Sequence, residues 1–289
     1  MAFKYSVILD TLAMTGNNVF EKPKEILEAI RSAGFDGVDI GANTAEQRKQ
    51  LPDIVNTARS LGLKVPAFLG AWAVWHGGEE RDLASEDNAV RTYAVNYAKG
   101  CIDIAAQIGA NYFEICAAPA VNTYPLSKVP TDVLKKNFAQ SAIELCAYAR
   151  GRKVTVMIEP INRYEGHPGF MNSLKQAVDF VNELGIDNLA VLGDLFHMNI
   201  EDISFCDAFR AAGKRLKLVH LADHNRLMPG AGRIDFQAIL RTLREIGFTG
   251  YMSLDCVPPK PDMKTFLRSA LAHMKALEKA NELQEMLGV

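Results

Sequence analysis

The sequence predicts an α/β protein built as one (β/α)₈ barrel, also called a TIM barrel, and three observations support this. A pattern of amphipathic helix, glycine and apolar strand recurs seven times, from SAGFDGVDI at residues 32–40 to EIGFTGYMSL at residues 245–254. The apolar run YSVILD at residues 5–10 supplies an eighth strand. A length of 289 residues suits one such barrel, so we expect a single domain over residues 1–289.

Each later strand is a short apolar run that follows a glycine at a helix end. Glycine adopts the left-handed conformation just past a helix without a steric clash of a Cβ atom. Alternating helices and strands indicate a parallel sheet, and strands that are apolar almost throughout indicate a sheet covered on both faces. The helix-ending glycines are Gly34, Gly62, Gly109, Gly151, Gly185, Gly213 and Gly247. The expected strands, in order, end the segments 5–10, 32–40, 60–68, 107–115, 149–159, 183–194, 211–220 and 245–255, and one closing helix covers 262–286.

Two long insertions follow the third and fourth expected strands. Residues 70–90 hold Trp72, Trp75 and His76, and residues 117–131 are rich in alanine and proline. Long loops at the carboxyl ends of barrel strands build pocket walls and lids, so we expect these segments to border a binding pocket.

Composition and charge argue against nucleic acid and membrane partners. The chain carries 32 basic and 34 acidic residues, a formal net charge of −2, and no long basic run. We find neither a charged leader before an apolar stretch nor a membrane-spanning run, and we expect a cytoplasmic protein. Five cysteines, an odd number without a CxxC pair, are interpreted as reduced thiols.

Four polar residues stand where an expected strand ends: Glu159, Asp194, His220 and Asp255. They are separated by 35, 26 and 35 residues, about one strand–helix unit each, so a parallel barrel brings these ends together. Burying three carboxylates and an imidazole in one place is costly unless a cation compensates their charge. Oxygen and imidazole ligands suit Mg²⁺, Mn²⁺, Co²⁺ or Zn²⁺. The sequence therefore predicts a divalent metal centre at the barrel mouth.

Further polar residues lie close to these strand ends. Glu165 lies in EPINRYE, where Arg163 could hold either Glu159 or Glu165 through a two-pronged hydrogen bond. His197 is interpreted as a site residue, either as a metal ligand or as a hydrogen-bond donor to a substrate, although a core histidine is the alternative. Arg226 lies in a glycine-rich segment and suits a hydroxyl or carboxylate of a small polar substrate. Other candidates near this rim or behind it are Tyr5, Asp10, Asp39, Glu114, Asp223 and His224.

Two carboxylates beside a metal indicate proton-transfer chemistry. Glu159 and Asp255 come from well-separated strands, so one could remove a proton as base and the other return one as acid. A metal would polarise the neighbouring carbonyl and stabilise the enediolate. This arrangement favours epimerisation or isomerisation of a keto-sugar or related polyol. The glycines do not match a phosphate-binding P-loop, which favours a free, unphosphorylated sugar.

The segments IEPINRYE, GDLFHMNIED, VHLADHNRLMPGAGRIDF and YMSLD resemble the site segments of the xylose-isomerase-like barrels, most closely the ketose 3-epimerases of D-tagatose, D-psicose and L-ribulose. The resemblance covers nearly the whole chain. It implies a cis-enediolate mechanism, Mn²⁺ as the expected ion with Co²⁺ or Mg²⁺ as substitutes, and a homodimer or homotetramer. The resemblance implies that the metal ligands are Glu159, Asp194, His220 and Asp255. It implies that Glu159 and Asp255 transfer protons, and that Glu165, His197 and Arg226 contact the substrate.

One departure from the family keeps other reactions open. The family has glutamate where this chain has Asp255, which is one methylene shorter. A displacement of about 1 Å costs roughly a hundredfold in rate, so the shorter side chain affects the second acid–base role more than metal binding. A dehydratase or lyase acting on an inosose, a dehydroshikimate or a keto-glycoside needs only one base and is the alternative. Two further alternatives are a metal-dependent nuclease, which the near-neutral charge disfavours, and a non-catalytic sugar-binding barrel.

Overall fold

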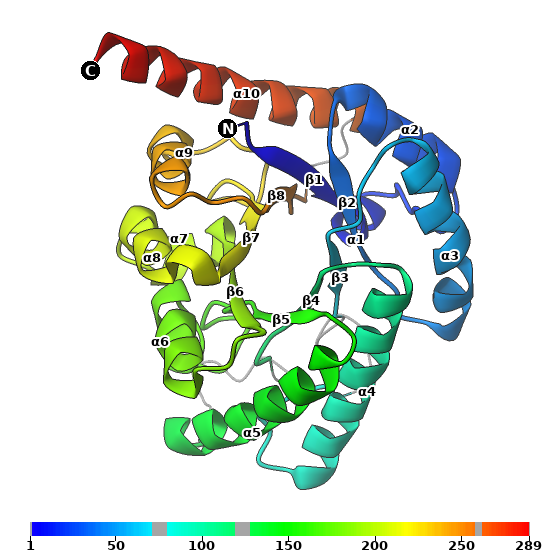
Figure 1. Cartoon of the computed structure of the whole chain (residues 1–289), viewed down its shortest axis with the longest axis vertical. Coiled ribbons are helices and arrows are strands. Elements are labelled where there is room, and N and C mark those ends of the chain that lie inside the picture. Colours follow the sequence, from blue (N-terminus) through cyan, green and yellow to red (C-terminus); the bar gives the residue numbers. More distant parts are fainter. Residues whose placement is uncertain (1, 71–79, 119–127, 258–261, 289) are drawn as a thin grey trace.

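The structure, a computed structural model, describes residues 2–70, 80–118, 128–257 and 262–288. Eight parallel strands follow one another around a closed barrel in which the last strand pairs with the first, and helices surround this sheet (Figure 1). The predicted fold class, a (β/α)₈ barrel, is therefore confirmed. The candidate pocket residues Trp72, Trp75 and His76 lie outside the described residues.

The elements alternate along the chain as the repeated pattern predicts. The strands are β1 (Lys4–Ile8), β2 (Gly37–Gly41), β3 (Ala67–Leu69), β4 (Tyr112–Ile115), β5 (Thr155–Ile158), β6 (Leu189–Asp194), β7 (Leu216–Leu221) and β8 (Tyr251–Leu254). The helices are α1 (Leu9–Met14), α2 (Pro23–Ala33), α3 (Ala45–Ser60), α4 (Asn88–Gln107), α5 (Thr131–Arg150), α6 (Leu174–Leu184), α7 (Leu195–Glu201), α8 (Phe205–Ala212), α9 (Phe236–Glu245) and α10 (Met263–Leu287), with a 3₁₀ turn, η2 (Gly213–Arg215). Side-chain caps fix several helix starts. Thr44 and Ser173, for example, each form a capping box with a glutamine three residues later.

Glycines with positive φ follow most of the expected helix ends. These are Gly34, Gly62, Gly109, Gly185, Gly213 and Gly247. At Gly151 the prediction is wrong, because its φ is −65°. Lys153 takes the left-handed conformation instead, with φ of 59°, and the N–H of Val154 donates to the carbonyl of Ala149. The chain thus makes a longer turn between α5 and β5, and the left-handed residue is the last but one before β5.

Two of the rim candidates belong to the interior rather than to the mouth. Asp39 lies within β2 and is fully buried, and its carboxylate accepts hydrogen bonds from the hydroxyls of Ser6 (2.7 Å) and Ser253 (2.5 Å). Burial raises the pKa of Asp39 above its ordinary value. The hydroxyl of Tyr5 donates to Glu278 of α10 at 2.9 Å, so Tyr5 contacts the closing helix.

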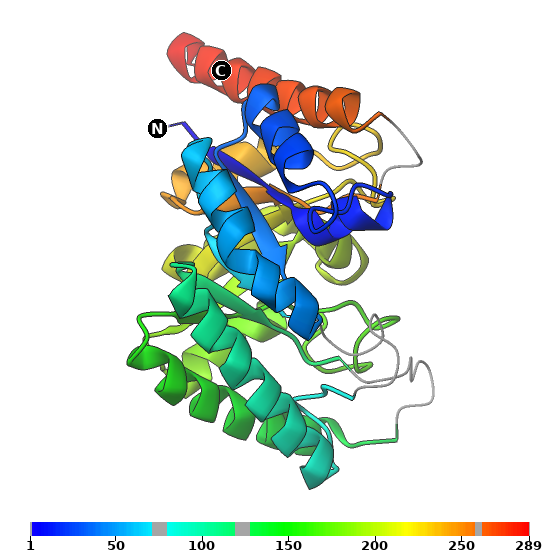
Figure 2. The ribbon, with the colours of Figure 1, turned by 90° about the vertical axis from the view of Figure 1, so that its right-hand side faces the viewer.

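The first strand and the last helix lie side by side, as both views show (Figures 1 and 2). The N–H of Phe3 donates to Glu278 at 3.3 Å, and α10 packs against α2 and α9. The closing helix predicted for residues 262–286 is confirmed with nearly the same bounds. Within the described ranges, every helix is too short or too polar to cross a lipid bilayer.

Candidate metal centre

The four predicted metal ligands lie at one mouth of the barrel, at the carboxyl ends of β5 to β8. Glu159 directly follows β5, Asp194 ends β6, His220 is the last residue but one of β7, and Asp255 directly follows β8. These strands are neighbours in the closed sheet, and Asp194 is paired with His220 in its register. All four side chains are buried. Strand order alone therefore brings the four residues together.

Two overlapping groups of ligand atoms lie close enough to share an ion. The ligand atoms of Asp194, His220 and Asp255 lie within 4.8 Å of one another, and so do those of Glu159, Asp194 and His197. His220 Nδ1 lies 3.1 Å from Glu159 Oε1 and 3.7 Å from Asp194 Oδ2. The residue set thus contains the four predicted ligands and one further histidine.

Two buried atoms of this cluster lack a hydrogen-bond partner in the described part of the chain: Asp194 Oδ2 and His220 Nε2. An unpaired buried polar group costs about 1–3 kcal/mol. The other carboxylate oxygen of Asp194 accepts the N–H groups of Phe196 (2.6 Å) and His197 (3.3 Å) at the start of α7, which fixes this side chain. Three carboxylates and one imidazole, with an unpaired atom on Asp194 and another on His220, form a ligand set that suits a divalent cation.

The negative charges of the carboxylates in this cluster favour a bound cation. Burial alone would raise the pKa of Asp194, but the neighbouring imidazoles of His197 and His220 hold it well below its ordinary value. Burial alone would lower the pKa of His220, but the carboxylates of Glu159 and Asp194 hold it well above its ordinary value. The carboxylates therefore favour positive charge between them, whether it comes from a proton or from a metal ion.

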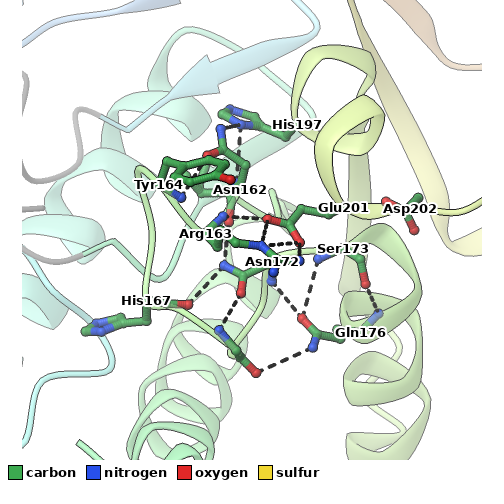
Figure 3. A network of polar contacts seen from close by, with 12 residues as sticks. Asn162, Arg163, Tyr164, His167, Asn172, Ser173, Gln176, His197, Glu201 and Asp202 are labelled. Atoms are coloured by element: carbon green, nitrogen blue, oxygen red, sulfur yellow. Dashed lines mark hydrogen bonds and ion pairs between the residues drawn. The ribbon is translucent and has the colours of Figure 1, made fainter. Parts of the chain in front are cut away.

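The orientation of His197 follows from its contacts with Asn162 (Figure 3). The backbone N–H of Asn162 donates to His197 Nδ1 at 3.3 Å, and the side-chain nitrogen of Asn162 lies 2.7 Å from the same atom. That side chain is fixed, because its oxygen accepts the N–H of Tyr164 and its nitrogen donates to Glu165. A backbone N–H can only donate, so His197 Nδ1 is an acceptor and the ring proton lies on Nε2.

This protonation pattern separates the two candidate ligand groups. His197 Nε2 lies 3.9 Å from Asp194 Oδ2, and as a protonated nitrogen it has no free lone pair for a metal. His197 Nδ1 is already occupied by Asn162. The geometry therefore favours a centre built from Glu159, Asp194, His220 and Asp255, with His197 as a hydrogen-bond donor beside it.

Arg226 lies next to the last carboxylate of this group. Its Nη2 donates to Asp255 Oδ2 at 2.6 Å, and its Nη1 lies 3.9 Å from Glu165 Oε2. The guanidinium also lies 4.6 Å from the centre of the Phe196 ring, within cation–π range. The three predicted substrate contacts, Glu165, His197 and Arg226, thus surround the carboxylate cluster.

Asp223 organises the loop that carries Arg226. Its fully buried carboxylate accepts backbone hydrogen bonds from His224, Gly230, Gly232, Arg233 and Ile234, at 2.8 to 3.2 Å. A Cβ atom at Gly232 would lie 2.2 Å from this carboxylate, so the close approach requires glycine. Arg226 itself adopts φ of 60°, and its N–H donates to the carbonyl of Asp223. Asp223 therefore fixes the backbone from which Arg226 reaches Asp255.

A cavity of about 790 Å³ opens beside the cluster. The site residues that line it are Glu159, Glu165, His197, His220, Arg226 and Asp255. Glu114, a rim candidate, also lines the cavity and accepts the N–H of Gly70 at 2.9 Å. Small-molecule sites of this kind combine a large cavity with a few convergent polar groups.

Sequence reasoning missed two contacts in this site. Asn162 was not singled out, although it lies inside EPINRYE, where a buried amide could have been expected to hold a neighbouring side chain. Arg163 forms a two-pronged ion pair with Glu201 of α7, at 2.9 and 2.6 Å, a partner outside its own segment (Figure 3). Both contacts join the loop after β5 to α7, and together they hold this side of the mouth.

Fold and cluster together define the class: a (β/α)₈ barrel with a buried group of potential metal ligands at the carboxyl ends of its strands. The model of the xylose isomerase-like TIM barrel family matches residues 27–277, so the chain belongs to that family. This confirms the resemblance drawn from the sequence.

Individual relatives are sugar epimerases. The chain is 28% identical to D-psicose 3-epimerase of Enterocloster bolteae over 238 residues, which are 80% of this chain and 75% of that protein. It is 27% identical to 3-dehydro-D-guloside 4-epimerase of Escherichia coli over 262 residues, 88% of this chain and 95% of that protein. A solved structure of L-ribulose 3-epimerase matches with a TM-score of 0.84 over 99% of this chain and 98% of that chain, at 20% identity, which supports the fold.

Proposed function

We propose that the protein is a metal-dependent epimerase or isomerase of an unphosphorylated keto-sugar, with Mn²⁺ as its ion. The observation that carries the proposal is the buried cluster of Glu159, Asp194, His220 and Asp255, with its two unpaired atoms, beside a large cavity. The activities named for the relatives, on D-psicose and on a 3-dehydro-guloside, support the reaction class. When bound, the ion would polarise a substrate carbonyl and stabilise negative charge on the adjacent carbon.

Glu159 and Asp255 are the proposed proton-transfer groups. They follow β5 and β8, which β6 and β7 separate in the closed sheet, so they approach the cavity from different directions. One carboxylate removes the proton from the carbon next to the carbonyl, and a cis-enediolate forms. The other carboxylate returns a proton to the opposite face, which inverts that carbon. On a free ketose this is 3-epimerisation.

The remaining site residues would hold the sugar. His197 offers an Nε2–H donor whose direction Asn162 fixes. Glu165 accepts hydrogen bonds from hydroxyls, and Arg226 donates to a substrate oxygen from its position above the Phe196 ring. These contacts orient the sugar so that its reacting carbon lies between the two carboxylates.

A dehydratase or lyase is the second candidate, and one contact favours it. Arg226 donates to Asp255 Oδ2 at 2.6 Å, so one oxygen of the second carboxylate is engaged by a cation. Elimination of water beside a carbonyl needs one base, which Glu159 supplies, and an acid for the departing hydroxyl. Inosose, dehydroshikimate and keto-glycoside substrates fit this chemistry.

Proton exchange with solvent separates the two reactions. The Mn²⁺-loaded protein is incubated in D₂O with a panel of ketoses, a keto-glycoside and an inosose, and the products are analysed by NMR. Deuterium at the carbon next to the carbonyl, with inversion there, is the result we expect. Loss of water would support the dehydratase, and no exchange in any compound would overturn both proposals.

The domain organisation, ligands, location and assembly of the enzyme are also proposed. We propose one domain over residues 1–289, a small-molecule sugar or polyol as substrate, no nucleic-acid or membrane partner, and a cytoplasmic homodimer or homotetramer. Light scattering coupled to gel filtration tests the assembly, and a monomer mass of 31.8 kDa would contradict it.

A further inference from the structure

Asp10 places another carboxylate at the cavity, on the side away from β5 and β6. It lies in the first turn of α1, directly after β1, and it lines the cavity that Glu159 and His220 also line. The register pairs Val7 of β1 with Leu254 of β8, so the end of β1 lies beside Asp255. Burial raises the pKa of Asp10 above its ordinary value, and the charge of Asp255 adds to this rise, as expected for two carboxylates near one space.

Gly41 at the end of β2 keeps Asp10 in this place. Its N–H donates to Asp10 Oδ2 at 2.8 Å, and a Cβ atom at position 41 would lie 3.1 Å from both carboxylate oxygens. A carboxylate accepts about four hydrogen bonds, so Asp10 retains acceptor capacity beyond those from the backbone N–H groups of Gly41 and of Asp10 itself. The pair therefore combines a fixed orientation with free lone pairs, as a hydroxyl-binding group requires.

The surroundings of Asp10 differ from those of the metal cluster. The same cavity is lined by apolar and amide side chains from α1, the segment after it, the segment before α3 and α3 itself, and by the hydroxyl side chains of Thr11 and Thr44. The apolar and amide residues include Ala13, Met14, Asn18, Val19, Phe20, Asn43 and Gln47. Apolar surface beside hydrogen-bond acceptors suits a sugar ring, whose faces are apolar and whose edges carry hydroxyls.

The cavity is larger than one hexose needs. Its volume of about 790 Å³ lies in the upper part of the range of roughly 300–1,000 Å³ in which pockets enclose drug-sized ligands. The proposed metal ligands and substrate contacts come from β5 to β8 and their loops, so they account for one side of it. None of the proposed metal ligands and substrate contacts comes from β1, β2 or α1, the elements around Asp10.

We propose that Asp10 and the wall around it form a second sugar subsite, so that the natural substrate is a keto-sugar carrying a glycosyl substituent rather than a free ketose. Asp10 accepts hydrogen bonds from two hydroxyls of the substituent, and Phe20 packs on its apolar face. This inference rests on the proposed function for the identity of the first sugar. The alternative is that Asp10 only ties β1 to β2 through Gly41.

Binding measurements test the subsite without requiring turnover. Calorimetry compares fructose with maltulose, leucrose and isomaltulose, in which glucose is attached to O4, O5 or O6 of fructose, on the Mn²⁺-loaded protein. We expect at least one disaccharide to bind about tenfold to a hundredfold more tightly than fructose, the range that two additional hydrogen bonds allow. If none binds more tightly than fructose, the subsite is wrong.

Variants then assign the effect to Asp10. Asp10→Asn keeps shape and the bond to Gly41 through its side-chain oxygen, and it should remove most of the disaccharide advantage while fructose affinity changes by less than about twofold. Gly41→Ala, which displaces the carboxylate, should act in the same direction, and Glu46→Gln on the exposed start of α3 is the charge control. An advantage that survives both variants, or an equal loss for fructose, would show a purely structural role. Failure of deuterium exchange with a preserved disaccharide advantage would overturn the proposed reaction but not the subsite.

Discussion

Asn162 determines which nitrogen of His197 carries the proton, because its backbone N–H donates to Nδ1. In Asn162→Asp, a carboxylate would face His197 Nδ1 at about the present 2.7 Å and draw the proton to that nitrogen. We expect kcat/KM to fall by about 10- to 100-fold, as for other groups that orient a site histidine. The fall should be smaller in Asn162→Ala, which keeps the backbone donor.

Nitrogen NMR of labelled histidine is the direct measurement, because Nδ1 and Nε2 signals report the tautomer. Asn172→Asp is the matched control, since Asn172 is a buried asparagine of the same loop that bonds to the carbonyls of Ile161 and His167. It should lower the melting temperature but leave the His197 signals unchanged. An unchanged tautomer in Asn162→Asp would contradict the assignment.

Asp255 has different roles in the proposed epimerase mechanism and in the alternative dehydratase mechanism. Asp255→Asn keeps a ligand oxygen but removes the base, so the two-base mechanism predicts a split between exchange and inversion. Glu159 should still exchange the proton of one epimer with solvent. Inversion should fall by about 10²- to 10⁴-fold, the usual contribution of one acid–base group. Saturating Mn²⁺, with the bound metal measured, controls for weakened binding, and unchanged inversion would exclude Asp255 from proton transfer.

The sequence predicts where the site residues lie better than it predicts which residues they contact. Glu159, Asp194, His220 and Asp255 could be placed because each ends an apolar run, and strand ends meet at one mouth. The partner of Arg163 could not be predicted in this way. Glu201 lies 38 residues further along the chain on α7, and its position depends on how that helix packs. The proton on His197 likewise depends on a loop amide that no periodic pattern marks.

At the scale of elements, the loop from Asp223 to Ile234 is held by one carboxylate. Asp223→Asn would replace a charged acceptor of five backbone N–H groups by a neutral one, and hydrogen bonds to charged groups contribute about 1.5–3 kcal/mol each. We expect faster hydrogen exchange at Gly232 and Arg233. Because the loop carries Arg226, we also expect a loss in kcat/KM of about tenfold or more. Normal exchange in the variant would show that Asp223 does not hold the loop.

The same loop should loosen in acid. Burial opposes the charge on Asp223, but the hydrogen bonds from His224 and from the backbone outweigh it and lower the pKa of Asp223 below its ordinary 3.8. A carboxyl group with a lowered pKa in the folded state stabilises that state above its ordinary pKa. The stabilisation is lost as pH falls from about 4 through the folded value. Loop exchange protection, corrected for intrinsic rates, should therefore be full at pH 6 and reduced at pH 3 in the wild type. In Asp223→Asn it should depend little on pH.

Helices and strands were the most predictable level, for a physical reason. Apolar runs and helix-ending glycines are local signals, and all eight strands follow the expected order. Where a signal failed, at Gly151, the turn after α5 used a left-handed lysine two residues later. The turn conformation there depends on how α5 meets β5, and the sequence pattern does not contain that information.

At the scale of the whole molecule, a metal at the mouth should stabilise the fold, since it would join side chains of four strands. At a concentration of one hundred times Kd, Mn²⁺ should add about 2.7 kcal/mol, and the melting temperature should rise by roughly 5 °C. A chelator should reverse the rise. Asp194→Asn should abolish it, while Asp103→Asn, on the outer surface of α4, should preserve it. An equal rise in wild type and Asp194→Asn would place the ion elsewhere.

Closure of the barrel could be predicted from the sequence only indirectly, from the number of strand–helix units. It places Asp10, near the start of the chain, beside Asp255, near its end, because β1 pairs with β8. Sequence reasoning found both residues at strand ends but could not assign Asp10 to the cavity or Asp39 to the interior. That distinction depends on the direction of each side chain from the closed sheet.

Anomalous diffraction from crystals grown with Mn²⁺, recorded at the manganese absorption edge, would locate the ion in the barrel mouth. We expect one strong peak within about 2.0–2.6 Å of ligand atoms from Glu159, Asp194, His220 and Asp255, with His197 still bonded to Asn162. No peak at this mouth at saturating metal, or a peak bound through His197 in place of His220, would contradict the account.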